Sequence, residues 1–195
     1  MNLIAKASSV VRPHPGFESC GDAVLCLEPD GAQLFVVIDA LGHGPDAAQS
    51  ATRAREVIHG LVSPALGELF DMVDRGLAGL REVVMSALRV ERGTVRFAGV
   101  GNVELFGPPE VSRPAPQVGR VGRGLRPLRE SILPVSAGQR WALASDGLRH
   151  REMRRALDQT RRLPLVEAAA NLLELVGRDD DDASVLLVDF DEVRP

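Results

Sequence analysis

The sequence predicts an α+β protein whose sheets are antiparallel, and three observations support this class. Apolar segments of strand length cluster before and after a stretch of helical periodicity. Consecutive strand segments are separated by tight turns, such as Arg92-Gly93 and Gly101-Asn102. The strands do not alternate regularly with helices, as a parallel βαβ sheet would require. At 195 residues, the chain has the length of one domain.

The first half of the chain divides into three strands and two helices. Residues 3–11 and 22–28 read as strands, and residues 33–39 form a continuous apolar run typical of a strand buried on both faces. A Gly-His-Gly-Pro segment then ends the strand pattern, and Pro45 with Asp46 opens a helix that we expect to run to about residue 60. Apolar residues on one helical face predict a second helix over residues 64–79.

The next segments predict a strand meander followed by an irregular excursion. The expected meander strands are residues 82–90, 94–99 and 103–106. Residues 108–130 hold five prolines and three glycines, which indicates a mobile or irregular excursion.

The last third predicts a hairpin, two helices and a closing strand. We expect residues 131–137 and 140–145 to pair around Gly138. Helices are expected over residues 150–161 and 164–176, and the final strand over residues 183–190.

Composition places the chain among globular proteins without a membrane span. The residues are 45% hydrophobic and 26% charged, and no apolar stretch approaches the roughly 20 residues that a membrane span needs. The N-terminus lacks the apolar segment of a signal peptide, and Cys20 and Cys26 are expected to be reduced thiols. We therefore expect a cytoplasmic protein that does not bind membranes.

Charge is unevenly distributed along the chain. Residues 112–162 contain 12 arginines and four acids, a balance of +8, whereas the remaining residues carry 11 basic and 23 acidic side chains, a balance of −12. Trp141 is the only aromatic residue in the basic segment, so it lacks the stacking groups typical of nucleic-acid binding. The segment is either a solvated surface or a docking site that steers phosphate groups. For the second reading, the candidate substrate-binding residues are Arg120, Arg123 and Arg126.

Aspartates next to apolar runs mark a candidate metal site. Asp39 and Asp146 each end such a run, Asp181 and Asp182 precede one, and Asp22 follows Gly21. Carboxylates at strand ends can converge only if cations neutralise them, and Mg²⁺ or Mn²⁺ suits an all-oxygen ligand set. The alternatives are turn-forming aspartates and, for residues 179–182, a solvated acidic loop.

The order of these motifs resembles a known family. The chain reads Gly-Asp, Asp-Ala-Leu-Gly-His-Gly before a helix, Gly-Val-Gly-Asn-Val, Ala-Ser-Asp-Gly-Leu, and Asp-Asp-Ala-Ser before a terminal strand. This order resembles the metal-dependent (type 2C, PPM) serine/threonine protein phosphatases, in particular their bacterial SpoIIE branch. Residues 99–103 are similar to the RsbX-type members, which dephosphorylate stressosome proteins. The resemblance implies two antiparallel β-sheets packed as a sandwich and flanked by pairs of α-helices.

The resemblance also implies a ligand set for two Mn²⁺ or Mg²⁺ ions. Asp39 would bridge them, and Asp146 and Asp181 would complete the first shell. The main-chain carbonyl of Ala40 would bind the second ion, and Asp22 would also bind that ion, directly or through water. Asp182, next to Asp181, is the less favoured of that pair.

Three positions depart from the family pattern. Ala40 stands where glycine is usual, and a left-handed conformation there would be strained. Leu41 stands where eukaryotic relatives carry a histidine, so His43, two positions later, is the catalytic candidate beside Asp39 and Asp146; the alternative is a local hydrogen-bonding role. Arg12 is the candidate for an N-terminal phosphate-binding arginine.

The implied function is hydrolysis of phosphoserine or phosphothreonine by attack of a metal-bound water. The implied partner is a phosphorylated STAS-domain regulatory protein of a stressosome-like module, and we expect no nucleic-acid partner. Residues 1–195 would form one catalytic domain with no appended sensor domain. The alternatives are an inactive phosphoprotein-binding module on the same fold and a two-metal hydrolase of nucleic acid or small phosphate esters.

Overall fold

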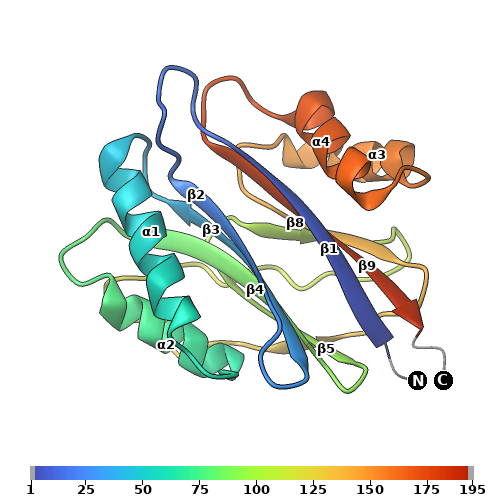
Figure 1. Cartoon of the computed structure of the whole chain (residues 1–195), viewed down its shortest axis with the longest axis horizontal. Helices are drawn as coiled ribbons and strands as arrows, with labels where there is room; N and C mark the ends of the chain where they lie inside the picture. The colour runs from blue at the N-terminus through green and yellow to red at the C-terminus, as the bar shows by residue number, and fades with distance from the viewer. Residues whose placement is uncertain (1–2, 193–195) are drawn as a thin grey trace.

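Two antiparallel sheets pack face to face, and a pair of helices covers the outer face of each sheet (Figure 1). The computed structural model describes residues 3–192. The predicted fold class, including the sandwich and its flanking helix pairs, is confirmed.

The five-stranded sheet has the order β2-β3-β4-β5-β7. Its strands are β2 (Asp22–Leu27), β3 (Ala32–Ala40), β4 (Val83–Glu91), β5 (Thr94–Val100) and β7 (Ser131–Leu133). The four-stranded sheet has the order β1-β9-β8-β6, with β1 (Leu3–Arg12), β9 (Ala183–Glu192), β8 (Arg140–Ala144) and β6 (Glu104–Phe106). The helices are α1 (Pro45–His59), α2 (Leu66–Gly76), α3 (His150–Thr160) and α4 (Leu165–Val176).

Three apolar layers hold these elements together. The outer face of the five-stranded sheet packs on α1 and α2, and the outer face of the four-stranded sheet packs on α3 and α4. The two inner faces meet in a third layer that includes Phe35, Phe97 and Trp141. Strand β3 is buried on both faces, as its continuous apolar run predicts, because Val36 packs toward α1 and α2 while Val37 packs into the sandwich.

Two predicted strand pairings are wrong. Strand β6 does not continue the meander from β5 but pairs with β8 in the other sheet. Residues 131–137 and 140–145 do not form a hairpin, since β7 pairs with β5 while β8 pairs with β6 and β9. In both places the chain crosses between the sheets, and the apolar pattern of a strand does not say which sheet it joins.

The segment between β6 and β7 is irregular, as its prolines and glycines predict. It is nevertheless attached to the body of the protein. Val121 pairs with Val83, Gln117 pairs with Val100, and Asp74 of α2 accepts hydrogen bonds from the backbone N–H groups of Gly122 and Gly124.

The remaining expectations concern α2, the cysteines and membrane spans. Helix α2 is shorter at both ends than the predicted 64–79. Both cysteines are free thiols, as expected. Among residues 3–192, no helix has the length and apolar character needed to cross a bilayer.

Candidate metal centre

The first two carboxylates face each other across neighbouring strands. Asp22, the first residue of β2, is the register partner of Asp39 near the end of β3. Directly opposed residues of an antiparallel pair have Cα atoms about 4.5–5.5 Å apart, and like charges in such positions repel. Asp22 is only 5% exposed, so this repulsion acts in a poorly solvated place.

Asp146 follows the end of β8 and joins the same site. The Asn102 side-chain amide donates a 2.6 Å hydrogen bond to its carboxylate. Burial, and then the charges of Asp22 and Asp146, raise the pKa of Asp39. The next residue is Gly147, where a Cβ atom would stand 1.9 Å from the Asp182 carbonyl oxygen. Only glycine therefore allows the turn after β8 to lie this close to the start of β9.

The Ser145 hydroxyl links three strands behind the site. It donates a 2.6 Å hydrogen bond to Asp22 and accepts one of 2.9 Å from the Ser184 backbone N–H. This buried hydroxyl therefore connects the end of β8 with the start of β2 and the start of β9, and it fixes the orientation of the Asp22 carboxylate.

The two adjacent aspartates before β9 have different positions. Asp182 is 4% exposed and accepts hydrogen bonds from the backbone N–H groups of His14 (2.7 Å) and Gly21 (2.9 Å). These bonds tie the loop between β1 and β2 to β9, which is a structural use of the carboxylate. Asp181 is partly exposed. Its charge contributes to the raised pKa of Asp39, after burial and the charges of Asp22 and Asp146, and the charge of Asp146 contributes, after burial, to the raised pKa of Asp181.

Burial and mutual repulsion disfavour the charged forms of these carboxylates. Burial first, and then the charges of Asp182 and Asp146, raise the pKa of Asp22 to about 7, although the hydrogen bond from Ser145 opposes the shift. Burial and the charges of Asp22, Asp146 and Asp181 raise the pKa of Asp39 well above its usual value. Burial and Asp146 also raise the pKa of Asp181. A group of acids with raised pKa values is typical of a functional site.

The donor set fits a hard divalent cation. Within residues 3–192, no salt bridge to Lys, Arg or His neutralises Asp22, Asp39, Asp146 or Asp181. In the same residues, no group of three or more His, Cys, Asp and Glu side chains is arranged so that it could hold a metal ion. Carboxylate oxygens with uncompensated charge, in a partly buried site, are the chemistry that Mg²⁺ or Mn²⁺ satisfies.

Ala40 adopts an ordinary backbone conformation. The only non-glycine residues with positive φ in the described range are Asp30, Ser63 and Arg92. Ala40 is 1% exposed, and its backbone N–H donates to the Gly21 carbonyl at 3.0 Å. The alanine therefore imposes no left-handed strain at the position where the family usually carries glycine.

His43 lies on the exposed loop between β3 and α1. Its ring packs in a tilted arrangement against His14, with ring centroids 4.4 Å apart, and against Phe17, at 4.8 Å. Arg81 spans the base of this loop, donating to the Leu41 carbonyl and to the Asp46 carboxylate. Among the described residues, no hydrogen bond connects His43 to the four carboxylates.

The candidate arginines are placed differently from one another. Arg120 and Arg123 form ion pairs with the buried Glu82, whose backbone carbonyl accepts a hydrogen bond from Leu41, while Arg126 is exposed. The Arg12 guanidinium donates to the Arg178 carbonyl and lies 3.9 Å from an Asp179 carboxylate oxygen.

Sequence reasoning missed two residues that orient the ligands. Ser145 and Asn102 both lie inside motifs, but their types gave no reason to assign a role. The position of Asn102 in a Gly-Asn turn beside a strand end could have indicated its role. The role of Ser145 could not be found in this way, because its partner Asp22 lies 123 residues away in the chain.

Comparison with solved structures identifies proteins of the same fold. No family model and no curated protein matches the sequence. A structure described as the bacterial stressosome, a modular system adapted to control secondary messenger signalling, contains a chain with a TM-score of 0.86 and 28% identity, covering 95% of this chain and 99% of that one. RsbX in complex with magnesium has a TM-score of 0.83 and 19% identity, covering 95% of each chain.

A third similar structure is the catalytic domain of the serine/threonine protein phosphatase PstP in complex with two manganese ions. Its TM-score is 0.73 at 16% identity, covering 97% of this chain and all of that one (100%). The chain therefore has the fold of the type 2C phosphatases.

Proposed function

We propose that this protein is a metal-dependent protein serine/threonine phosphatase. The observation that carries the proposal is the meeting of Asp22, Asp39, Asp146 and Asp181 at one site, with no ion pair to a basic side chain among the described residues. The five motifs in family order and the type 2C fold support the same chemistry.

The proposed ligand roles come from the resemblance to the type 2C phosphatases. Two Mn²⁺ or Mg²⁺ ions would be held by the carboxylates of Asp22, Asp39, Asp146 and Asp181 and by the Ala40 carbonyl. Bound ions of this kind acidify water and neutralise charge on a transferring phosphoryl group. The chain itself holds the ligands in place, since Ser145 orients Asp22 and Asn102 orients Asp146.

We assign proton transfer to the leaving oxygen to His43. It is exposed on the loop that directly follows the Asp39-Ala40 pair, and tilted contacts with the rings of His14 and Phe17 restrict its ring. His43→Asn should lower kcat for a phosphoserine peptide by about a hundredfold, because a serine alkoxide leaves poorly without a proton donor. It should hardly affect p-nitrophenyl phosphate, whose leaving group needs no proton. Equal losses on both substrates would contradict the assignment.

The proposed substrate is a phosphorylated STAS-domain protein of a stressosome-like module. This choice rests on the motif resemblance and on the likeness to a stressosome chain. Arg120, Arg123 and Arg126 are proposed to contact it, because their loop pairs with the start of β4 near the Asp39-Ala40 end of β3. We also propose that the chain acts as a single catalytic domain.

The test is phosphate release from such a phosphoprotein in Mn²⁺ and in a chelator. We expect release only with Mn²⁺, and no release by the Asp146→Asn variant. Binding of the phosphoprotein without any turnover, on it or on p-nitrophenyl phosphate, would indicate an inactive binding module. Faster Mn²⁺-dependent cleavage of single-stranded DNA would indicate a nuclease.

A further inference from the structure

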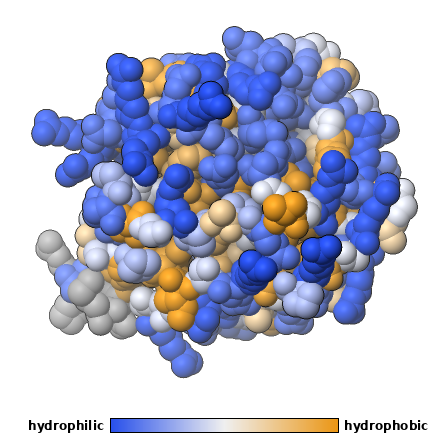
Figure 2. All heavy atoms as spheres, turned by 180° about the vertical axis from the view of Figure 1, so that it is seen from behind, coloured by the Kyte–Doolittle hydropathy of each residue, from blue (hydrophilic) through white to orange (hydrophobic). Residues whose placement is uncertain are grey.

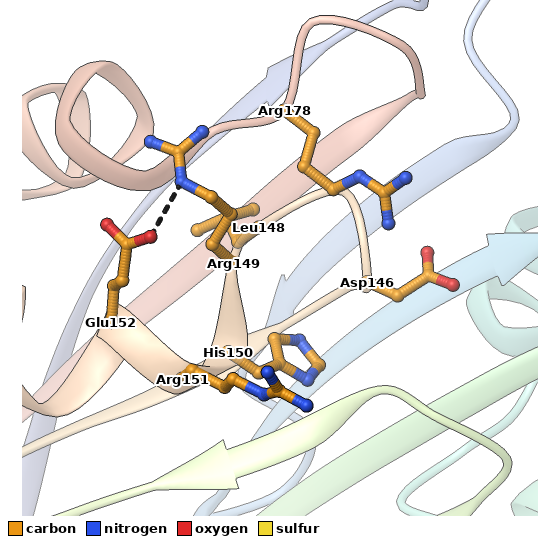
Figure 3. Close-up of a pocket in the computed structure, with 7 residues that line it drawn as sticks. All are labelled: Asp146, Leu148, Arg149, His150, Arg151, Glu152 and Arg178. Atoms are coloured by element: carbon orange, nitrogen blue, oxygen red, sulfur yellow. Dashed lines mark hydrogen bonds and ion pairs between the residues drawn. The ribbon is translucent and has the colours of Figure 1, made fainter.

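Two cavities share one arginine and together lead away from the metal centre. The first, of about 450 Å³, is lined by Asp146, Arg178 and Arg151 among others (Figure 3). The second, of about 890 Å³, begins at Arg151 and extends along α3 to Arg161. A ligand lying in both cavities would therefore start beside Asp146 and follow the helix.

The arginines of α3 and the residue that follows it form one face. The face begins at Arg151, and the other three arginines follow it by three, four and ten positions: Arg154, Arg155 and Arg161. This spacing places all four on the same side of a helix. All four line the second cavity and are exposed, whereas Met153 and Ala156 are buried on the opposite side.

This face, which we call the α3 arginine track, is not neutralised by the protein. Among residues 3–192, no salt bridge involves any of its four arginines. Two of the cavity's acids are already used, since Asp189 pairs with Arg140 and Asp191 with Lys6. Glu110 and Asp158 remain as its unpaired acids. Neighbouring like charges on a helix face repel, so the track costs helix stability unless an anion binds.

The track therefore differs from the arginines beside β4. Arg120 and Arg123 already share Glu82, whereas the α3 guanidinium groups can each contact a new carboxylate. Figure 2 shows long hydrophilic side chains protruding from the side of the molecule that α3 and α4 occupy, at upper left in that view.

We propose that the α3 arginine track binds an acidic segment of the substrate protein that flanks its phosphorylated residue. This rests on the proposed function, because the reacting residue must sit beside Asp146. Ten residues of helix span about 15 Å, which an extended peptide covers with about five residues. The track thus selects substrates whose acidic residues lie close to the phosphoresidue in sequence.

A protein segment fits the cavity better than nucleic acid does. Phe190 is the only aromatic residue in its lining and is fully buried, so no base can stack on it. Pro108, Pro109 and Leu157 give the cavity an apolar part that suits peptide side chains.

Three phosphoserine peptides test the proposal. The first carries four glutamates within five residues of the phosphoserine, the second carries them seven or more residues away, and the third carries glutamines. We expect kcat/KM about tenfold higher for the first than for the others, through KM, since several exposed ion pairs add up to about this factor. The triple variant Arg154→Gln/Arg155→Gln/Arg161→Gln should lose this preference and keep its rate on p-nitrophenyl phosphate.

A matched control separates local contacts from net charge. Arg55→Gln/Arg75→Gln/Arg96→Gln removes three exposed arginines elsewhere and should keep the preference. Equal kcat/KM for all three peptides, or a preference that survives in the α3 variant, would overturn the proposal.

Binding without chemistry distinguishes this failure from failure of the proposed function. In a chelator, fluorescence anisotropy should show that the glutamate-flanked peptide binds the wild type more tightly than the α3 variant, even if neither protein turns over. Tighter binding of single-stranded DNA than of this peptide, lost in the α3 variant, would assign the track to nucleic acid and overturn the proposal.

Discussion

The raised pKa of Asp22 links the stability of the protein to pH and to cation binding. It is buried opposite Asp39, and folding raises its pKa from the usual value of 3.8 to about 7. Between these values the folded protein holds a proton that the unfolded chain has released. Without a divalent cation, the free energy of unfolding should therefore fall as the pH rises from about 4 to about 7.

This pH dependence gives a test at one residue. In a chelator, chemical denaturation should show that Asp22→Asn removes part of the fall in unfolding free energy between pH 4 and pH 7, because asparagine mimics the protonated acid. Mn²⁺ should stabilise the wild type more at pH 8 than at pH 5, since the cation competes with protons. A wild-type protein that becomes more stable across this range in a chelator would contradict the assignment.

Ala40 gives a second test at the same scale. Because its backbone is not left-handed, replacing it with glycine relieves no strain. Ala40→Gly should keep the turnover rate of the wild type, since the carbonyl is retained, and should lower the unfolding free energy by about 0.5–1 kcal/mol. Loss of turnover in the folded variant would show that the methyl group itself is needed.

Among the elements, the strand ends at the site depend on the Ser145 hydroxyl. Ser145→Ala would leave the Ser184 N–H and one Asp22 oxygen without this partner, at a cost of about 1–3 kcal/mol in unfolding free energy. Ser184→Ala is the matched control, because the buried Ser184 hydroxyl has no hydrogen-bond partner within residues 3–192. Chemical denaturation should give a clearly lower unfolding free energy for Ser145→Ala than for Ser184→Ala. Equal stabilities would mean that the hydroxyl link is not what connects β2, β8 and β9.

How far the sequence predicts the structure also differs between elements. Strand β3 and helix α1 are predictable because a buried strand and a Pro-initiated helix depend on local pattern and turn chemistry. The pairing of β6 and β7 is not, because each short strand joins a sheet through partners far along the chain. The carboxylates could be named from their motifs, but the Ser145 and Asn102 contacts depend on tertiary packing.

At the scale of the whole molecule, the sandwich brings four distant segments to one end. Asp22, Asp39, Asp146 and Asp181 come from both sheets, so the site exists only when β2 and β3 pack against β8 and β9. The basic segment of the sequence is also divided by the fold into a β4-side loop and the α3 arginine track. Substrate recognition and catalysis are thus expected on different elements, and Asp146 lies where the candidate metal centre meets the cavity beside α3.

The most direct test of the account is the rate of phosphoserine-peptide hydrolysis as a function of Mn²⁺ concentration. The variants to compare are Asp39→Asn and, as a matched control, Asp179→Asn, which changes an exposed acid next to the site. We predict a saturable, Mn²⁺-dependent rate for the wild type and Asp179→Asn, and no rate at any Mn²⁺ concentration for folded Asp39→Asn. Hydrolysis by the wild type in a chelator, or an unchanged rate in Asp39→Asn, would contradict the metal-centre account.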